Sequence, residues 1–318
     1  MNRNFMRRAF APTALAASLA LVLAACGGQS GNSAEGASGS VAVDGSSTVF
    51  PLSDAAAELL AEEGSGVNVT VGTSGTGGGF EAFCAGKTDI SDASRPIKED
   101  EEVPVCEENG VDYTELHVAT DALTVVVGKD SPIDCITTEQ LKKIWEPAAQ
   151  GKITNWKQVD PSFPDAPLKL FGPGTDSGTF DYFTDEINGE EGASRSDYEA
   201  SEEDNVIVEG VANTEGAMGY FGYTYYEENA DKLKALEIDS GDGCVAPSVE
   251  TAQAGEYTPL SRPLFIYVAN KSYNDKPAVK EYVDFYIDNL TDIAEAAEYI
   301  PLNEEQLGET EKTLAGLK

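Results

Sequence analysis

The chain has 318 residues and a large excess of acidic side chains, with 56 Asp and Glu against 21 Lys and Arg. This balance argues against nucleic acid as a partner, because binding to a phosphate backbone requires clustered basic residues. The sequence has a single His and no CxxC pair, which argues against a zinc site. The length suits one large domain or two of medium size.

The first 25 residues have the pattern of a secretory signal peptide. Arg3, Arg7 and Arg8 form a short basic region, and a mostly apolar run over 9–25 follows. The run ends in small residues directly before Cys26, as in the bacterial lipobox, where this Cys carries the lipid. Two or three acyl chains, at about 0.8 kcal/mol for each buried CH₂, hold a protein firmly at a membrane surface. We therefore expect 1–25 to be a lipoprotein signal peptide and Cys26 to be the lipidation site.

Residues 26–40 are rich in Gly, Ser and Ala and show no apolar periodicity, so we expect a flexible tether there. Because the signal peptide contains three Arg and no acidic residue, the rest of the chain carries a formal charge of −38. Such a charge suits solubility at high ionic strength, where repulsion is screened beyond a Debye length of about 10 Å or less.

From Val41 onward, strand-like and helix-like segments alternate. The sequence predicts a strand over 41–43, a helix over about 51–62 that Gly64 ends, and a strand over 67–71. A Gly-rich turn over 72–79 then opens a helix that runs through Cys84, and a short strand begins at Asp89. Further along we expect, in order, a strand at 123–127, a helix at 138–145, a strand at 168–171, a turn at 172–177 and a helix at 179–187. The repeated order of strand, loop and helix predicts an α/β fold with largely parallel sheets.

Three of the loops between a strand and a helix are rich in Ser, Thr and Gly. They are DGSSTVFP at 44–51, GTSGTGGGF at 72–80 and GPGTDSGTF at 172–180. Helix N-termini offer unpaired N–H groups, Gly allows close approach of the backbone, and hydroxyls can donate to an anion. Such loops can build an oxyanion site with little formal charge, although a Ser or Thr at this position is more often a plain helix cap.

Together, these loops and two further stretches resemble the PstS family of phosphate-binding proteins. The matching stretches are, in chain order, GSSTVFPL, GTSGTGGGFEAF, DISDASRPI, GPGTDSGTFDYF and GAMGYFGY. The resemblance covers essentially all of 41–318 and implies a two-lobed type II periplasmic-binding-protein fold, with the ligand in the interlobe cleft. We expect the first lobe to comprise 41–120 and 265–318, and the second lobe to comprise 121–264.

The resemblance also implies a function without covalent chemistry. We expect an extracytoplasmic solute-binding lipoprotein, anchored to the outer face of the cell membrane, that captures inorganic phosphate between its lobes. It would deliver phosphate to the permease subunits of an ABC importer. It would act as a monomer, without a cofactor, and would not be an enzyme.

The family's phosphate contacts can be carried onto matching positions of this sequence. Ser47 and Thr48 match the first phosphate loop, where a hydroxyl and neighbouring N–H groups bind oxygen. Thr76, with Ser74 as the alternative, matches the Ser of the second loop. The resemblance thus implies that hydroxyls of the first lobe bind one side of the anion.

Ser177, Gly178 and Thr179 match the SGT triplet of the family's best-known branch directly, but two other positions depart from that branch. The position of the Asp that accepts the phosphate proton holds Ser94, and the position of an Arg that precedes the triplet holds Pro173. The proton acceptor and the cation must therefore come from elsewhere in this chain, while Ser94 itself stays among the expected phosphate contacts.

Arg95 and Arg195 are our candidates for the missing cation, since a guanidinium can bind two phosphate oxygens at once. Surface salt bridges are the alternative role for both. The candidates for the proton acceptor are Asp44, Asp92 and Asp176, and the sequence does not decide between them.

Four Cys remain if Cys26 carries lipid, and an even number in an exported domain predicts two disulfides with three connectivities. We favour Cys84–Cys106 and Cys135–Cys244, because each pair would then lie within one lobe of the fold that the resemblance implies.

Three alternative functions remain open at this stage, and one of them is a surface adhesin or sensor that binds the anion without serving an importer. Binders of sulfate or molybdate share the fold. An extracellular phosphatase or hydrolase has less support, because GxSxG is absent and the lone His117 lies in a strand-like run where a structural role is expected.

Overall fold

The computed structural model describes residues 38–175 and 177–317. The expected signal peptide, Cys26, most of the expected tether and Asp176 lie outside the described residues. In the described part, none of the helices is both long and apolar enough to cross a membrane.

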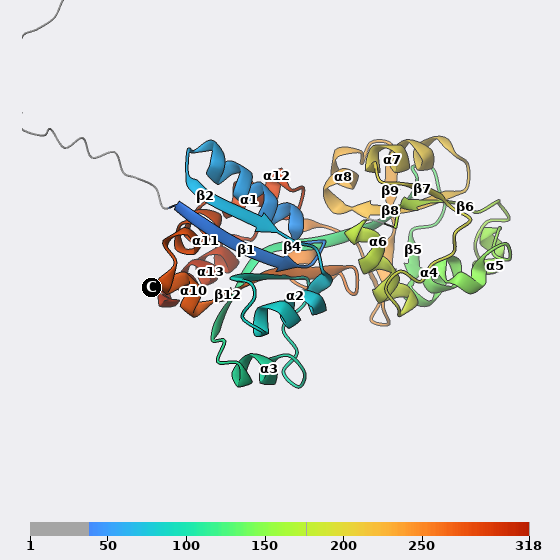
Figure 1. Ribbon diagram of the computed structural model, residues 1–318. Helices are drawn as coiled ribbons and strands as arrows, with labels where there is room; N and C mark the ends of the chain where they lie inside the picture. The colour runs from blue at the N-terminus through green and yellow to red at the C-terminus, as the bar shows by residue number, and fades with distance from the viewer. Residues whose placement is uncertain (1–37, 176, 318) are drawn as a thin grey trace, which may run out of the picture. The chain divides into compact units, whose positions relative to one another are not determined.

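The first lobe combines segments from the two ends of the described chain, and β4 leads from it into the second lobe (Figure 1). Its elements are β1 (Ser38–Gly45), α1 (Phe50–Glu62), β2 (Gly66–Val71), α2 (Gly75–Cys84), β3 (Ile90–Ala93), α3 (Val103–Glu108), β4 (Tyr113–Gly128), β12 (Ser261–Ala269), α10 (Asn270–Asp275), α11 (Pro277–Asp288), α12 (Leu290–Ala296) and α13 (Glu304–Leu317).

The second lobe is built from the middle of the chain. Its elements are β5 (Cys135–Thr137), α4 (Thr138–Trp145), the 3₁₀ turn η1 (Pro147–Ala149), α5 (Trp156–Val159), β6 (Lys169–Pro173), α6 (Gly178–Phe183), the π-helical turn η2 (Thr184–Asn188), β7 (Glu199–Ser201), α7 (Asp204–Asn213), β8 (Ala217–Gly222), α8 (Tyr223–Glu228), β9 (Leu233–Ala235), β10 (Glu237–Asp239), β11 (Cys244–Val245) and α9 (Val249–Gln253).

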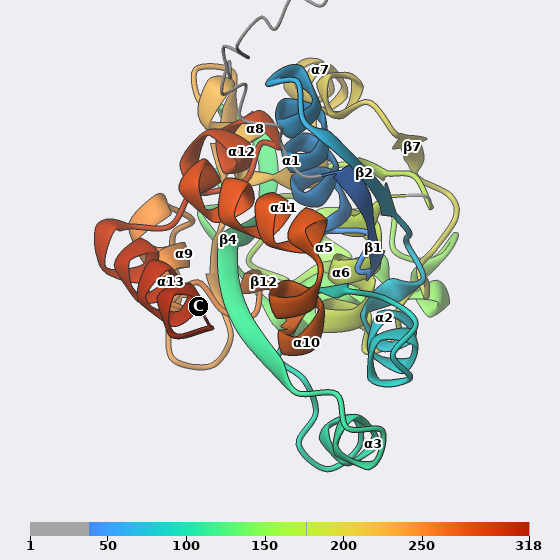
Figure 2. The same ribbon diagram turned by 60° about the vertical axis from the view of Figure 1, so that its left-hand side comes forward.

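One sheet runs through both lobes, in the order β2-β1-β3-β12-β4-β8-β6-β7, and β9 also pairs with β4. The pairs β1–β2, β1–β3, β6–β7 and β6–β8 are parallel, whereas β12 and β4 run antiparallel to their neighbours. β4 is a single long, curved strand (Figure 2) that pairs with β12 in the first lobe and with β8 in the second. Together, β4 and β12 are the strands through which the lobes are connected.

Each lobe has its own hydrophobic core. The larger core of the first lobe packs α1, α11 and α12 against the sheet and includes Leu52, Ile266 and Tyr282. The main core of the second lobe lies around Trp145 and Tyr220. Two cores joined by two strands agree with the two-lobed α/β fold expected from the sequence, while the expected lobe boundaries themselves stay a prediction.

Most predicted elements are present, with three shifts. β1 begins at Ser38 instead of Val41, because Ser38, Gly39 and Ser40 continue the parallel pairing with β2, which requires only backbone groups. The Gly-rich segment expected as a turn forms the first turns of α2 from Gly75 onward. The helix expected over 179–187 is divided into α6 and η2.

Both expected disulfides are present. Cys84–Cys106 joins α2 to α3 in the first lobe, and Cys135–Cys244 joins β5 to β11 in the second. We refer to them below as the α2–α3 disulfide and the β5–β11 disulfide.

Candidate functional site

The loop between β1 and α1 lies at the carboxyl end of β1. The N–H of Ser46 donates to the carbonyl of Asp92 at 2.9 Å, which ties the loop to β3. Gly45 makes this approach possible: its φ is +147°, and a Cβ there would lie 2.1 Å from the Asp92 carbonyl oxygen. The Tyr299 hydroxyl donates to the Thr48 carbonyl at 2.7 Å and holds the loop from the other side. The two predicted hydroxyls of this loop are therefore presented on a fixed backbone.

The loop between β2 and α2 is held to the first loop by one carboxylate. Oδ1 of Asp44 accepts from the N–H of Gly45 at 2.9 Å and from the N–H of Ser74 at 3.0 Å. Thr76 in turn contacts the segment after β3, since its Oγ1 lies 3.0 Å from the Ser94 Oγ and accepts from the Ser94 N–H at 3.2 Å. Hydrogen bonds thus join all three first-lobe segments that carry predicted ligands.

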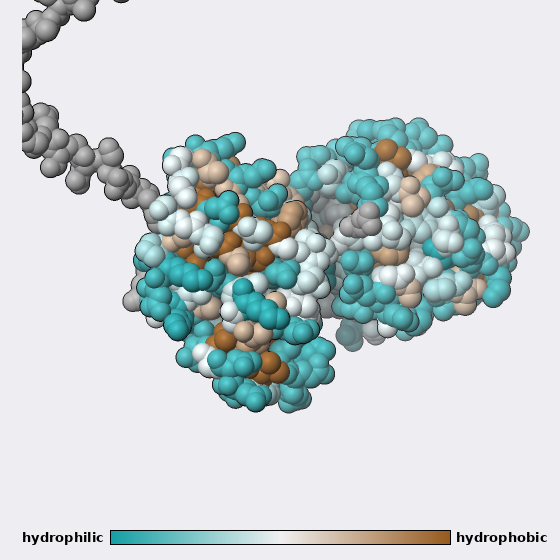
Figure 3. All heavy atoms as spheres, viewed as in Figure 1, coloured by the Kyte–Doolittle hydropathy of each residue, from teal (hydrophilic) through white to brown (hydrophobic). Residues whose placement is uncertain are grey.

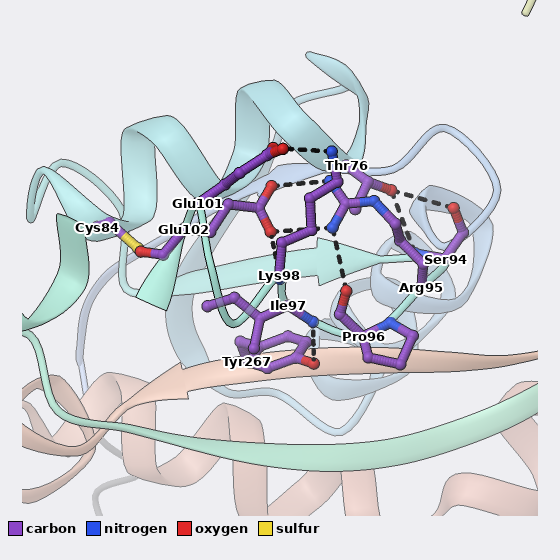
Figure 4. A network of polar contacts seen from close by, with 10 residues as sticks. All are labelled: Thr76, Cys84, Ser94, Arg95, Pro96, Ile97, Lys98, Glu101, Glu102 and Tyr267. Atoms are coloured by element: carbon purple, nitrogen blue, oxygen red, sulfur yellow. Dashed lines mark hydrogen bonds and ion pairs between the residues drawn. The ribbon is translucent and has the colours of Figure 1, made fainter. Parts of the chain in front are cut away.

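Arg95 follows Ser94 and lies beside these hydroxyls (Figure 4). Its guanidinium donates to both carboxylate oxygens of Glu102, at 2.9 and 2.7 Å. About one third of the Arg95 side chain is exposed (34 %). The surface salt bridge expected as its alternative role is present, yet the side chain also lines the pocket described below.

In the second lobe, the triplet at 177–179 begins α6. Ser177 is the N-cap of this helix and accepts from the Thr179 N–H at 3.2 Å, so its hydroxyl has the ordinary capping role. Gly178 faces the first lobe closely, because a Cβ there would lie 3.0 Å from the Thr48 Oγ1. A glycine at this position lets α6 approach the first loop without a clash.

These segments surround one pocket of about 360 Å³, to which both lobes contribute. In Figure 3, the surface is hollowed between the lobes, and polar residues cover much of the face shown. The lining residues are Ser46, Ser47, Thr48, Ser74, Gly75, Thr76, Gly77, Ser94, Arg95, Gly178, Asp181, Tyr182, Asp185, Glu186, Glu191 and Arg262. Of the nine predicted site residues, Ser47, Thr48, Thr76, Ser94, Arg95 and Gly178 line the pocket; Ser177, Thr179 and Arg195 do not.

Arg262 is an arginine of the pocket that was not among the cations expected from the sequence. It lies at the start of β12 and donates from Nη2 to the Thr48 Oγ1 at 2.8 Å and from Nε to Asp121 at 3.2 Å. Its guanidinium also lies over the Tyr182 ring, 3.5 Å from the centroid. One signal was available: residues 26–318 contain only three Arg, and this one lies beside an expected lobe boundary.

The structure places Arg195 elsewhere, in the interior of the second lobe. It is buried, with 4 % exposed, and its guanidinium forms hydrogen bonds with the Asp197 carboxylate and with the carbonyls of Ile144 and Ile153. The expectation that Arg195 could supply the cation is therefore not met. Its charge is used to tie together loops around α4, and Arg262 lies in the pocket instead.

The second-lobe wall of the pocket is acidic. Burial raises the pKa of Asp181, and neighbouring Glu191 adds to the rise while Arg262 opposes it. Burial also raises the pKa of Glu186, with Asp185 adding to the rise. These groups take up protons more readily than ordinary carboxyls, and they lie opposite the hydroxyls of the first lobe.

The candidate proton acceptors Asp44 and Asp92 do not line the pocket. Asp44 uses its carboxylate to hold the two loops. Asp92 is completely buried behind the first loop, where its Oδ1 accepts from the Ser53 hydroxyl at 2.9 Å. Burial raises the pKa of Asp92 to about 8, and Asp44 adds to the rise while the Ser53 hydrogen bond opposes it. Both carboxyls are engaged in contacts within the first lobe.

His117 has a structural environment, as expected. It lies in β4, outside the pocket, with Nε2 3.0 Å from the Ala119 carbonyl oxygen and its ring packed on Phe265. Burial lowers its pKa. In the described residues, one group of side chains is close enough to hold a metal, and it consists of Glu237 and the two Cys of the β5–β11 disulfide.

Comparisons with known proteins agree with this architecture. A family described as a PBP superfamily domain matches residues 30–289. Protein SphX of Synechocystis sp. is 51 % identical over 267 residues, covering 84 % of this chain and 79 % of SphX. The phosphate-binding protein PstS of Staphylococcus saprophyticus is 40 % identical over 308 residues, covering 96 % of this chain and 93 % of PstS.

A solved structure extends the likeness to the fold. The crystal structure of a possible phosphate binding protein from Planctomyces limnophilus superposes with a TM-score of 0.83 at 44 % identity, covering 88 % of this chain and 99 % of that one. The match to the family model, over residues 30–289, includes all three loops around the pocket. The chain therefore belongs to the PstS family within the PBP superfamily.

Proposed function

We propose that this protein captures inorganic phosphate in the pocket between its lobes and delivers it to the permease of an ABC importer. The observation that carries the proposal is the convergence of three hydroxyl-bearing segments, Arg95 and Arg262 on one pocket of a PstS-family chain. Members of this family are binding proteins of transport systems, not enzymes.

The first lobe would supply most of the hydrogen bonds to phosphate. Ser47, Thr48 and Thr76 present hydroxyls there, and Ser94 stands beside Thr76. Hydrogen bonds to a charged partner contribute about 1.5–3 kcal/mol each, so a few suffice for tight binding without a large positive charge. This matters in a chain whose net charge of −35 repels anions at long range.

Arg262 would link phosphate binding to the position of the lobes. Its guanidinium already contacts Thr48 of the first lobe and the ring of Tyr182 in the second. Phosphate held by both lobes would favour the closed arrangement, because only that arrangement makes both sets of contacts. Gly178 would allow this closure, since its lack of a side chain leaves room for Thr48.

The acidic wall would favour phosphate over sulfate. At neutral pH, phosphate carries a proton that can be donated to a carboxylate, whereas sulfate has none. Asp181 in α6 lines the pocket and is the described carboxyl that we propose as the acceptor, because Asp44 and Asp92 lie outside it. A carboxylate that faces an oxyanion without a proton between them is a mispairing that costs about 1–3 kcal/mol or more.

The cellular setting follows from the N-terminal sequence. Removal of 1–25 and lipidation of Cys26 would anchor the protein to the outer face of the cell membrane, and the polar residues after Cys26 would let the lobes stand away from the lipid. There it would act as a monomer and present its closed form to the permease. Radiolabelled palmitate incorporated into the wild type but not into Cys26→Ala would test the anchor.

Calorimetry on the fragment 38–318, stripped of ligand by partial unfolding and refolding, tests the ligand. We expect saturable one-to-one binding of phosphate that excess sulfate or molybdate does not displace. A preference for sulfate or molybdate would show that the ligand is another tetrahedral oxyanion and not phosphate. Turnover of a phosphate ester by the same sample would contradict a pure binding role.

A further inference from the structure

The guanidinium of Arg95 is fixed along one of its edges. Nη1 and Nη2 donate to the two carboxylate oxygens of Glu102 at 2.9 and 2.7 Å, and Nη1 also donates to the Pro96 carbonyl at 3.0 Å (Figure 4). The guanidinium lies near the Phe80 ring, with its Cζ 5.5 Å from the centroid. These contacts hold the plane and the direction of the group.

This arrangement leaves the other edge of the guanidinium directed away from Glu102. A guanidinium has five N–H groups, and the contacts above use two on Nη1 and one on Nη2. Nε–H and the second Nη2–H remain, and they form a fork that matches two oxygens of an oxyanion. Arg95 lines the phosphate pocket, so this second edge is the one available to an anion there.

Glu102 is itself held in place by its surroundings. Its Oε2 accepts from the Lys98 N–H at 2.8 Å, and the residue is the N-cap of α3. The α2–α3 disulfide fixes that helix to α2, and the Cys84 Sγ lies 3.6 Å from the Glu102 carbonyl oxygen. Burial works against its ionisation, but hydrogen bonds from Arg95 and Lys98 lower its pKa below the usual value. Glu102 is therefore an ionised group in a fixed position.

We propose that Glu102 is a positioning residue for anion binding, which holds Arg95 so that its Nε–Nη2 edge faces the pocket. This inference rests on the proposed function and adds to it a residue that neither lines the pocket nor touches the anion. An Arg side chain that is free to rotate loses rotamer entropy when it becomes fixed. Because the pair with Glu102 fixes Arg95 before the anion arrives, binding does not bear that cost.

A double-mutant cycle on phosphate affinity tests the inference. Calorimetry would compare wild type, Arg95→Ala, Glu102→Gln and the double variant. Glu102→Gln should weaken phosphate binding about 3- to 10-fold and Arg95→Ala roughly 10- to 100-fold. In the Arg95→Ala background, Glu102→Gln should change the affinity less than 2-fold, because no guanidinium remains to be positioned.

A matched control lies one residue away. Glu101 pairs with Lys98 at 2.9 Å on the same turn and is mostly exposed, so Glu101→Gln removes an equal charge and should leave the affinity unchanged. Glu102→Asp is a second variant that keeps the charge but shortens the reach, and its phosphate affinity should fall between those of wild type and Glu102→Gln. Thermal unfolding of each variant shows that it is folded.

The outcomes separate the two claims. If wild type binds no phosphate, the proposed function fails, and this inference fails with it. If wild type binds phosphate but Glu102→Gln binds equally well, or loses the same factor with and without Arg95, only the positioning role is overturned. An unchanged affinity in Arg95→Ala would overturn it too.

Discussion

Asp92 gives the protein a pH-dependent penalty that a single substitution should remove. The side chain is completely buried behind the first loop, and in the described part of the chain its Oδ2 has no hydrogen-bond partner. Burial raises its pKa from 3.8 to about 8. Between these two values the unfolded chain holds the carboxylate and the folded protein holds the neutral acid. Folding therefore takes up a proton, and stability falls as the pH rises.

The size of the effect follows from proton linkage. One proton taken up on folding lowers the free energy of unfolding by about 1.4 kcal/mol for each pH unit. From pH 5 to pH 7 Asp92 is ionised in the unfolded chain and neutral in the folded protein. Its contribution to the free energy of unfolding should therefore fall by about 3 kcal/mol over this range. Asn has nearly the same shape as the neutral acid, keeps the acceptor for Ser53 and does not titrate. The free energy of unfolding of Asp92→Asn should thus rise by about 3 kcal/mol relative to that of wild type between pH 5 and pH 7.

Urea unfolding of both proteins at pH 5, 6 and 7, without phosphate, measures this difference. Asp100→Asn, at an exposed position, removes the same formal charge and serves as the control. Its stability relative to wild type should stay nearly constant with pH. A difference between wild type and Asp92→Asn that does not change with pH would refute the buried neutral acid.

Three further predictions concern single contacts. Arg262→Ala leaves the buried Asp121 without its cation and should cost about 3 kcal/mol in urea unfolding at pH 8. The cost should be smaller at pH 5, since burial already raises the pKa of Asp121 and the unpaired acid would protonate; an equal cost at both pH values would contradict this. Gly178→Ala places a methyl group about 3 Å from Thr48 and should weaken phosphate binding while leaving the melting temperature nearly unchanged, whereas unaltered affinity in calorimetry would show that the lobes need no such approach. The β5–β11 disulfide joins cysteines 109 residues apart, and its replacement by two Ser should lower the free energy of unfolding by about 5 kcal/mol. The α2–α3 disulfide joins cysteines 22 residues apart, and its replacement should cost about 3 kcal/mol. The reverse order in urea unfolding would count against a chain-entropy origin of the stabilisation.

Local sequence pattern was sufficient for much of the fold. Helical spacing of apolar residues located α1, and alternation of apolar residues located β2, because burial of a face is a local property of the chain. The pattern treated the runs around Leu116 and Leu123 as separate, whereas the structure joins them in β4. The polar residues between them, Thr120 and Asp121, are buried by pairing with β12, which lies far away in sequence.

The loops of the site could be predicted from a sequence motif, whereas the positions of its arginine side chains depend on tertiary packing. Each of the three Ser, Thr and Gly loops contributes at least one residue to the pocket, because a family motif fixes both their order and their positions. The arginines were harder. Arg195 and Arg262 look alike in sequence, and only the fold shows that one is buried among the carbonyls around α4 while the other reaches Thr48.

The position of β12 in the sheet has a consequence for how the chain is made. β12 lies between β3 and β4, so the first lobe has a missing strand until Ser261–Ala269 has been synthesised. The strands of the second lobe that pair with β4 are all complete earlier, by Ala235. Contacts between distant segments form slowly, because a long loop must close first. We therefore expect the lobe that begins the chain to complete its fold last, because its sheet lacks β12 until the C-terminal segment has been made.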